Sequence, residues 1–270
     1  MNLELALYKI HENEDFEEIL FWGKIRGVVK DYYLALAVNY KGHYEFPHKR
    51  YFWSTNQNWT FAELPSINPN DKQYVEQFNV AFTGEHDKIL VEVQPAEDQE
   101  APEEEEAEKP EKDSLASTEE EKIPPKNFTE LDRLAFVVRA IDQDCSVVPR
   151  GAFRMTPAHE LSRNHSFAGL SREELRKLGD YHHFRNVQQS DKRDQLDRDD
   201  ALFTYDFLDE IQKDSPKCCW SIQIDASGNL ATVRSLLWPG YASFHVANTN
   251  KFGGLYIGDG IKNADLPFML

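Results

Sequence analysis

The stretch WSIQIDASGNLATVRSLLWPGYASFHVANTNKFGGLYI, residues 220–257, decides the fold of this chain. Apolar and polar residues alternate over 220–224, which is typical of a strand with one buried face. Asp225-Ala-Ser-Gly228 is typical of a turn, and Pro239-Gly240 marks another. Apolar segments joined by such short connections predict an antiparallel meander. Its strands are expected at 220–224, 230–237, 241–247 and 254–257.

A helical pattern precedes the meander. Apolar residues recur at helical spacing over 131–141, and Thr129 followed three residues later by Asp132 resembles a helix start. A full capping box would have Glu or Gln in place of Asp132. The apolar helical positions are Leu131, Leu134, Val137, Val138 and Ile141.

Four further segments fill the part between this helix and the meander. Residues 146–148 read as extended. Ser171-Arg-Glu-Glu174 is a complete capping box and predicts a helix that ends at Gly179. Residues 190–200 carry many charges of both signs and are expected to form an exposed loop, whereas 205–212 is a candidate for a last helix.

The N-terminal part begins with a candidate short helix at 3–10. Aromatic and β-branched residues over 19–29, with two glycines that disfavour a helix interior, predict a strand. Lys30-Asp31 is a plausible turn before a second strand at 32–40, which makes a hairpin. An aromatic cluster at 51–53, a turn at 56–58, a helix over about 69–79 and a strand at 89–93 complete this part.

The order of these elements predicts an α+β fold, with an antiparallel sheet or meander as the core and a few short helices. Strands and helices do not alternate regularly, which argues against a doubly wound α/β fold. Three regions are expected: an aromatic-rich part over 1–94, an insertion over 95–127, and an α+β part over 128–270. The sequence leaves open whether the two flanking parts form one domain.

The insertion concentrates the acidic charge of the chain. Residues 97–121 hold 13 acidic residues and two lysines, a charge of −11, so the other residues carry only −6 of the total of −17. Leu115 is the one large apolar side chain of this stretch, which is too little to offset the entropy of ordering it. A disordered linker or long surface loop is expected, serving as a solvated spacer or as a docking tail for a basic partner.

Composition excludes several classes of protein. The net charge of −17 disfavours binding to nucleic acid, although Lys49-Arg-Tyr-Phe-Trp53 could stack on single-stranded bases or form a core strand. The longest apolar run, 32–38, is too short to cross a membrane, and the N-terminus lacks the pattern of a signal peptide. We therefore expect a soluble intracellular protein, with hydrophobic residues making up 40% of the chain and able to form a core.

No arrangement of reactive residues indicates catalysis or metal binding. Cys145, Cys218 and Cys219 lack the spacing of a zinc site or a disulfide framework. His182 and His183 are adjacent, so a strand would place one in the core and one at the surface. The aspartates of 197–200 lack the glycine and glutamate of a calcium loop, and the glycines of 253–260 read as turns. We therefore assign no catalytic, cofactor-binding or metal-binding residue and expect a non-enzymatic protein.

Two apolar features call for a covering surface. Phe21 and Trp22 are neighbours on a predicted strand, so one is expected in the core and the other under a second layer or a partner. The chain ends in Asp-Leu-Pro-Phe-Met-Leu, residues 265–270. Leu266, Phe268, Met269 and Leu270 would be a sticky patch in water, so the chain's own sheet or a neighbouring subunit should cover them.

Several phrases of the sequence resemble the radial spoke head proteins, and the C-terminal third resembles the radial spoke head protein 9 family in particular. They occur in the same order as in that family and span nearly the whole chain from residue 18 onward, apart from the insertion. The phrases are Leu20-Phe-Trp-Gly-Lys-Ile25, Asp31-Tyr-Tyr-Leu-Ala35, Val148-Pro-Arg-Gly-Ala152, Phe167-Ala-Gly-Leu-Ser171, Trp220-Ser-Ile-Gln223, Arg234-Ser-Leu-Leu-Trp-Pro-Gly240 and Asp265-Leu-Pro-Phe-Met-Leu270.

The resemblance implies a structural subunit of the axonemal radial spoke head in a cilium or flagellum. Such a subunit helps to assemble the head and to transmit mechanical signals from the central pair that regulate dynein-driven beating. It implies the paralogous head proteins 4 and 6 as partners, indirect contact with central-pair projections, and neither nucleic acid, membrane nor cofactor. The competing interpretation is a small-molecule-binding or enzymatic α+β domain with a dispersed site. The residues of the partner interface stay unassigned.

Overall fold

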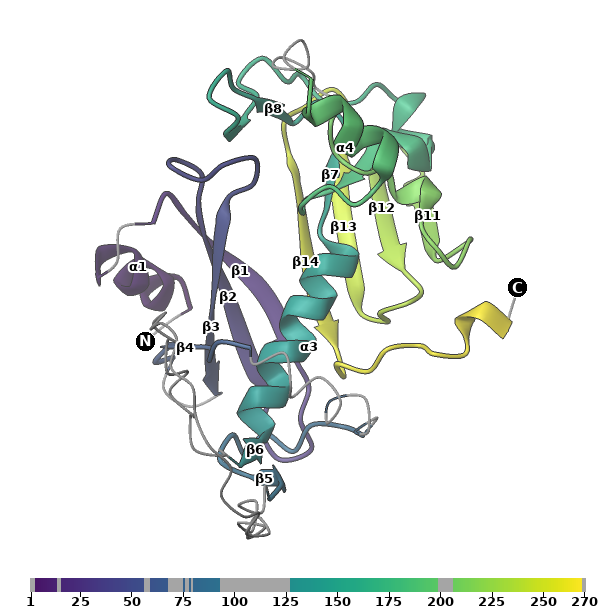
Figure 1. The fold of residues 1–270 in the computed structure, drawn as a ribbon. Coiled ribbons are helices and arrows are strands. Elements are labelled where there is room, and N and C mark those ends of the chain that lie inside the picture. The colour runs from purple at the N-terminus through teal and green to yellow at the C-terminus, as the bar shows by residue number, and fades with distance from the viewer. Residues whose placement is uncertain are drawn as a thin grey trace, which may run out of the picture.

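An eight-stranded sheet combines strands from both parts of the chain, in the order β11-β12-β13-β14-β1-β2-β3-β4 (Figure 1). The computed structural model describes residues 3–13, 16–55, 59–67, 75, 78, 80–92, 127–198 and 206–268. The strands of the sheet are β1 (Glu18–Ile25), β2 (Tyr32–Asn39), β3 (His48–Thr55), β4 (Ala62–Glu63), β11 (Trp220–Ile224), β12 (Leu230–Ser235), β13 (Tyr241–Val246) and β14 (Phe252–Gly258).

Three small strand pairs and several helices surround this sheet. The strand pairs are β5 (Ile89–Val91) with β6 (Phe128–Thr129), β7 (Val147–Pro149) with β10 (Tyr181–His183), and β8 (Phe153–Met155) with β9 (Leu161–Arg163). The α-helices are α1 (Leu3–Asn13), α3 (Glu130–Cys145) and α4 (Ser190–Leu196), and the 3-10 helices are η2 (Glu174–Arg176), η3 (Leu178–Asp180), η5 (Ile211–Lys213) and η6 (Leu266–Phe268).

The predicted α+β class, the meander β11–β14 and the β1–β2 hairpin are confirmed, because all of these neighbouring strands pair antiparallel. The β1–β14 pair, in contrast, is parallel and short, and joins Gly23–Ile25 to Tyr256–Gly258. Beyond these three residue pairs β1 and β14 diverge, so that the two halves of the sheet separate toward the other end of the strands (Figure 1). Gly23 permits this junction, since its φ is 151° and a Cβ there would lie 2.1 Å from the carbonyl oxygen of Tyr256.

The core lies between the sheet and α3, which crosses one face of the sheet where β14 and β1 meet. Leu134, Val138 and Ile141 of α3 are buried there, as the helical spacing predicts. The cap is a complete capping box, in which the Asp132 carboxylate accepts hydrogen bonds from the backbone N–H and hydroxyl of Thr129. Aspartate therefore serves where the sequence pattern calls for glutamate.

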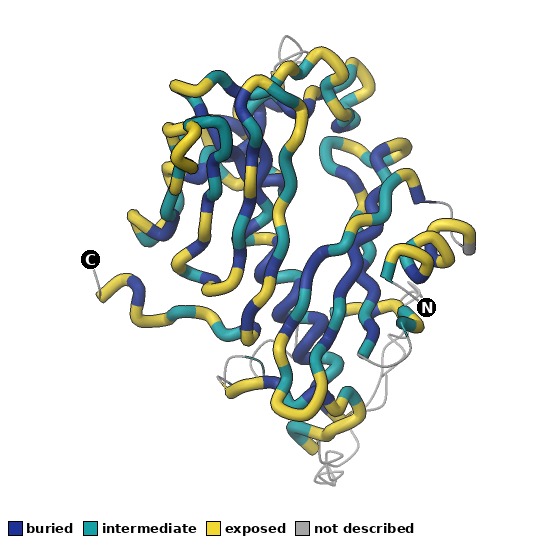
Figure 2. The backbone as a smooth tube through the Cα atoms, turned by 180° about the vertical axis from the view of Figure 1, so that it is seen from behind, coloured by how far each residue is buried: buried dark blue, intermediate teal, exposed yellow. Residues whose placement is uncertain are grey.

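The opposite face of β1–β3 is covered by α1 and the residues after it. Ile10 and Phe16 pack against Ala35, Ala37 and Phe52 in a second, smaller core. Figure 2 shows the result: the central strands are mostly buried, and the exposed residues gather on α1, on the loops and along the C-terminal end.

Three local predictions are wrong. Glu174 does accept hydrogen bonds from the backbone and hydroxyl of Ser171, but only η2 and η3 follow, because Lys177 is extended and interrupts them; Gly179 lies inside η3. Within the charged stretch 190–200, α4 forms because Lys192 and Leu196 share a buried side.

The third wrong prediction concerns 205–212. In the part of it that the structure describes, residues 206–210 are not helical and only η5 begins at Ile211. Three other expectations fall wholly or mainly on residues outside the described part: the turn at 56–58, the helix over 69–79, and the acidic insertion, of which only Asn127 is described.

The structure partly matches what was expected of the Phe21–Trp22 pair and of the apolar C-terminal residues. Trp22 is the buried member of the Phe21–Trp22 pair, at a bulge in β1, whereas Phe21 is half-buried. In the C-terminal tail Leu266 is buried, but Phe268 is 87% exposed. Residues 269–270 lie outside the described part.

Candidate functional site

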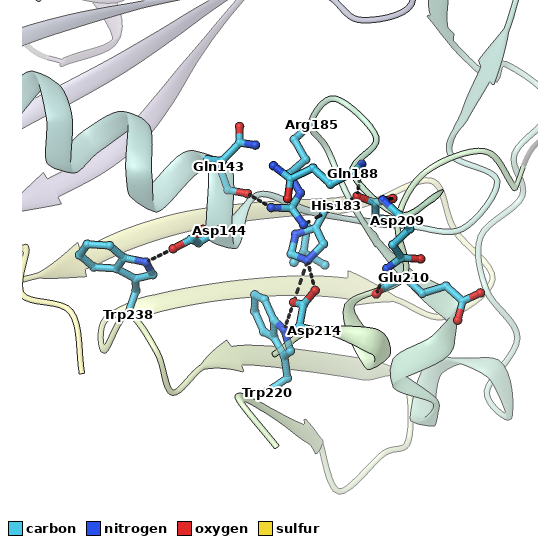
Figure 3. A network of polar contacts seen from close by, with 12 residues as sticks. Gln143, Asp144, His183, Arg185, Gln188, Asp209, Glu210, Asp214, Trp220 and Trp238 are labelled. Carbon is cyan, nitrogen blue, oxygen red and sulfur yellow. Dashed lines mark hydrogen bonds and ion pairs between the residues drawn. The ribbon is translucent and has the colours of Figure 1, made fainter. Parts of the chain in front are cut away.

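A layer of buried polar side chains lies between the C-terminal end of α3, β10 and the meander (Figure 3). It lines a cavity of about 280 Å³. The lining residues are Asp144, His183, Arg185, Gln188, Asp214, Ser215, Cys219, Trp220, Ser235 and Leu237. Because it brings the ionisable side chains of His183, Arg185, Asp144, Asp214 and Cys219 together around one cavity, this layer is the place to look for chemistry.

A histidine and an aspartate form the centre of the layer. His183 is fully buried, and its Nε2 lies 2.8 and 2.9 Å from the two carboxylate oxygens of Asp214. The indole N–H of Trp220 donates to the same carboxylate at 2.7 Å, and the backbone N–H of His183 donates to the carbonyl of Asp209 at 2.8 Å. Asp214 is therefore held by two side chains from different strands.

His182 is buried as well, so the prediction of one core and one surface histidine is wrong. β10 is covered on both faces: the His183 ring lies 6.0 Å from the Trp220 ring, and the His182 ring lies beside Asp206 on the other face. Burial lowers the pKa of His182 to about 4, and the carboxylate of Asp206, 3.4 Å from Nε2, only partly opposes this shift. The ring is neutral at pH 7.

The end of α3 contributes a second anchored carboxylate. Asp144 accepts a hydrogen bond from the indole N–H of Trp238 at 2.9 Å and from the ammonium group of Lys262 at 3.1 Å. Nearby, the Arg185 guanidinium donates to the carbonyl of Gln143 at 3.1 Å. Figure 3 shows the Trp238–Asp144 and Arg185–Gln143 contacts at the end of α3.

In nucleophilic catalysis of the Ser–His–Asp type, the free ring nitrogen of the histidine accepts the proton of a nucleophilic side chain. Among the described residues no side chain hydrogen-bonds to Nδ1 of His183. The thiol of Cys219 is no substitute, because burial and the nearby carboxylate of Asp214 raise its pKa to about 11. The described residues also hold no group of three His, Cys, Asp or Glu side chains placed to bind a metal ion. The hydrogen bonds of the layer join the end of α3, β10 and the meander to one another.

A similar network anchors the N-terminal strands to α3. Asp142 accepts hydrogen bonds from the Trp22 indole at 3.2 Å, the Lys49 ammonium at 2.6 Å and the Tyr51 hydroxyl at 2.9 Å. Lys49 also donates to the carbonyl of Phe184 at 2.8 Å. The stretch 49–53, considered above for base stacking, therefore directs its lysine and its tyrosine into the core.

Glu130, at the start of α3, is the buried carboxylate of a third network. It accepts hydrogen bonds from the Tyr32 hydroxyl at 2.7 Å, from the backbone and hydroxyl of Thr83, and from the backbone of Gly84. Burial by itself would raise the pKa of Glu130, but these donors outweigh it and lower the pKa below the ordinary value.

The sequence offered little signal for these networks. Asp142, Asp144 and Asp214 stand in no recognisable motif, because an aspartate that accepts a hydrogen bond from a distant tryptophan has no characteristic sequence spacing. The one available signal was the aromatic content, with five tryptophans, three of which donate to these aspartates.

No helix in the described part of the chain is both long and apolar enough to cross a bilayer.

The fold and its polar layers define the class of this protein: an α+β protein whose buried polar groups hold its own elements together. Comparison with known proteins then identifies the family. The chain is 35% identical to the radial spoke head protein 9 homolog of Danio rerio, over 99% of this chain and 90% of the relative. It is 33% identical to the homologs of Bos taurus and Homo sapiens, over 100% of this chain and 91% of each relative.

No family model matches the chain. The relatives nevertheless exceed 30% identity over nearly their whole length, and the chain belongs to the radial spoke head protein 9 family. The resemblance seen in the sequence is confirmed.

Proposed function

We propose that this chain is a structural subunit of the radial spoke head in the axoneme of a cilium or flagellum. The observation that carries the proposal is full-length similarity to several proteins named radial spoke head protein 9 homolog. The structure supports it, because the buried carboxylates bind tryptophan, lysine and tyrosine side chains of the chain itself. In this role the subunit helps to transmit central-pair signals that regulate dynein-driven beating.

The partners proposed for this subunit are other head components, in particular the paralogous head proteins 4 and 6. A dispersed enzymatic site is less well supported, since the His183–Asp214 pair has no nucleophile on its free nitrogen among the described residues. The family relationship likewise favours a structural role.

We further propose that residues 1–94 and 128–270 form one domain with the acidic stretch as an insertion. Supporting this, β1 pairs with β14, and Trp22 and Asp142 hydrogen-bond across the two parts. The ends of the insertion are anchored by β5 and β6, which pair with each other beside the start of α3.

The function is tested by replacing the endogenous protein in ciliated cells with a tagged copy of this chain. We expect the tag at the spoke heads in cryo-electron tomograms, recovery of beating, and co-purification of the paralogous head proteins from axonemes. A chain that stays outside the axoneme, or that enters it without density at the spoke head, would contradict the proposal.

A further inference from the structure

The two edges of the eight-stranded sheet are built differently. At one edge, β4 has only two residues, and Glu63 is held by Arg50 of β3. Short edge strands and charges are the usual protection against pairing with another chain. At the other edge, β11 has five residues, Trp220–Ile224, with no charge and no proline, in a chain that is 29% charged. This edge lacks such protection.

The hydrogen-bond register shows which backbone groups of β11 are free. The backbone N–H of Leu236 donates to the carbonyl of Cys219, and that of Asp225 donates to the carbonyl of Leu230. In an antiparallel ladder, bonded positions alternate, so Ser221 and Gln223 bond to β12. Trp220, Ile222 and Ile224 therefore direct their N–H and C=O groups outward, and no described strand lies beyond β11.

The side chains alternate in the same way. Trp220 is buried on the inner face, where its indole binds Asp214, and Ile222 and Ile224 follow on that face, half-buried. Gln223 is exposed on the outer face, with half-buried Ser221 beside it. The strand thus carries its apolar residues at the positions that also carry the free backbone groups.

This pattern is self-complementary. If a second copy is placed antiparallel with the two-fold axis at Ile222, that residue faces the partner's Ile222, and Trp220 faces the partner's Ile224. All three outward-directed positions then meet outward-directed positions, so each pair can exchange both backbone hydrogen bonds. Apolar side chains meet on the inner face, and Ser221 meets the partner's Gln223 on the outer face. No like charges oppose each other.

We propose that β11 is a homodimer interface, through which two copies of this chain join their sheets edge to edge in an isologous contact. The half-buried Ile222 and Ile224 are then covered by the partner's strand. The inference rests on β11 alone and is independent of the spoke-head assignment. An identical strand is the occupant we infer, because it pairs Ile222 with Ile222, Trp220 with Ile224 and Ser221 with Gln223 and brings no charged side chains together.

Cysteine cross-linking of the full chain tests the register. Exposed Cys218 is first changed to serine to remove background. Bonded antiparallel residues have Cα atoms about 5.5 Å apart, within disulfide reach. Ile222→Cys should therefore give a covalent dimer under mild oxidation. Gln223→Cys is the matched control and should not, since its counterpart is two residues out of register; Ser221→Cys with Gln223→Cys should cross-link again.

Solution mass gives the second measurement. We expect the unmodified chain to be dimeric at micromolar concentration, and Ile222→Lys to weaken the dimer about tenfold or more, because two ammonium groups meet on the axis. Gln223→Lys, which adds the same charge on the outer face, should stay dimeric. A monomeric unmodified chain, or cross-linking at 223 and not at 222, would overturn the proposal. Loss of a different head protein with Ile222→Lys, without a dimer, would also overturn it.

Discussion

At the scale of single residues, stability depends on tryptophan side chains that donate to buried or half-buried aspartates. Trp22, Trp220 and Trp238 donate to Asp142, Asp214 and Asp144, and each carboxylate has at least one further donor. Burying a carboxylate without hydrogen-bond donors costs free energy, so we expect the loss of any of these Trp–Asp hydrogen bonds to lower the free energy of unfolding.

Trp22→Phe tests this role. It keeps an aromatic ring but removes the indole donor to Asp142, and we expect a loss of about 1–3 kcal/mol in the free energy of unfolding, measured with urea. Trp53→Phe is the control, because the Trp53 indole packs on Tyr32 and His86 without a hydrogen bond to any described residue. Equal losses in the two variants would show that ring volume, and not the hydrogen bond, is responsible.

His182 predicts a pH dependence of stability. Its pKa falls from 6.5 to about 4 on folding, so the unfolded chain binds more protons between these values. The stabilisation is complete above about pH 6.5 and is lost as the pH falls toward 4, amounting to about 3 kcal/mol in total. Asp206 opposes this shift, whereas Lys192, Arg150 and His183 reinforce it.

The measurement compares urea unfolding at pH 7.5 and pH 5.0 for the parent and for His182→Asn, which cannot titrate. The parent should lose more stability than the variant over this interval. An identical loss in both would mean that other groups account for the acid sensitivity.

At the scale of elements, the β1–β14 pair is the only hydrogen-bonded strand pair that joins the two parts of the sheet within the described residues. Its three residue pairs need Gly23, because any side chain there would collide with the backbone of Tyr256. A short parallel ladder therefore depends on one residue without a side chain.

Gly23→Ala should cost about 2–4 kcal/mol of unfolding free energy, since it combines a steric clash with an unfavourable φ. Gly228→Ala is the matched control: φ is 71° there, but nothing lies within 4 Å of the added Cβ, so we expect about 1 kcal/mol. If the two variants lose similar amounts, the close approach of β1 and β14 is not required.

The C-terminal turn η6 offers a comparison within one element. Leu266 is buried and Phe268 is 87% exposed. Leu266→Ala should lower the unfolding free energy by about 2–4 kcal/mol, whereas Phe268→Ala should leave it unchanged. If a neighbouring head subunit covers Phe268, the second variant should co-purify less with head proteins. Equal melting curves for both variants would contradict the buried position of Leu266.

At the scale of the whole molecule, charge and fold are carried by different parts of the chain. Residues 97–121 hold −11 of the −17 net charge, and the sheet and α3 are built without them. The acidic stretch thus contributes about two thirds of the net charge, and the described core is formed by other residues.

Deleting 97–121 should shift the melting temperature by no more than a few °C, because no apolar burial is lost. Replacing the same residues with a Gly/Ser linker of equal length is the control for loop closure. A fall of 10 °C or more in both variants would show that the stretch contributes to the folded core.

Features that depend on neighbours along the chain could be predicted from the sequence. Alternation and turn residues predicted the meander and the β1–β2 hairpin, and helical spacing predicted α3, because periods of two and of 3.6 residues are local signals. The prediction was wrong where the local signal was weak. The helices η2 and η3 are too short to show a period, and the charged residues of α4 suggested a loop.

The way in which these elements combine depends on contacts between distant parts of the chain. The parallel β1–β14 junction joins residues more than 200 positions apart, and Trp22 binds Asp142 across 120 positions. Neither leaves a pattern along the chain, because the partners are chosen by packing and by the cost of burying a carboxylate without donors. The burial of both His182 and His183 could not be predicted for the same reason. Alternation along a strand predicts on which face each ring lies, but whether that face is exposed to solvent depends on the elements packed against it.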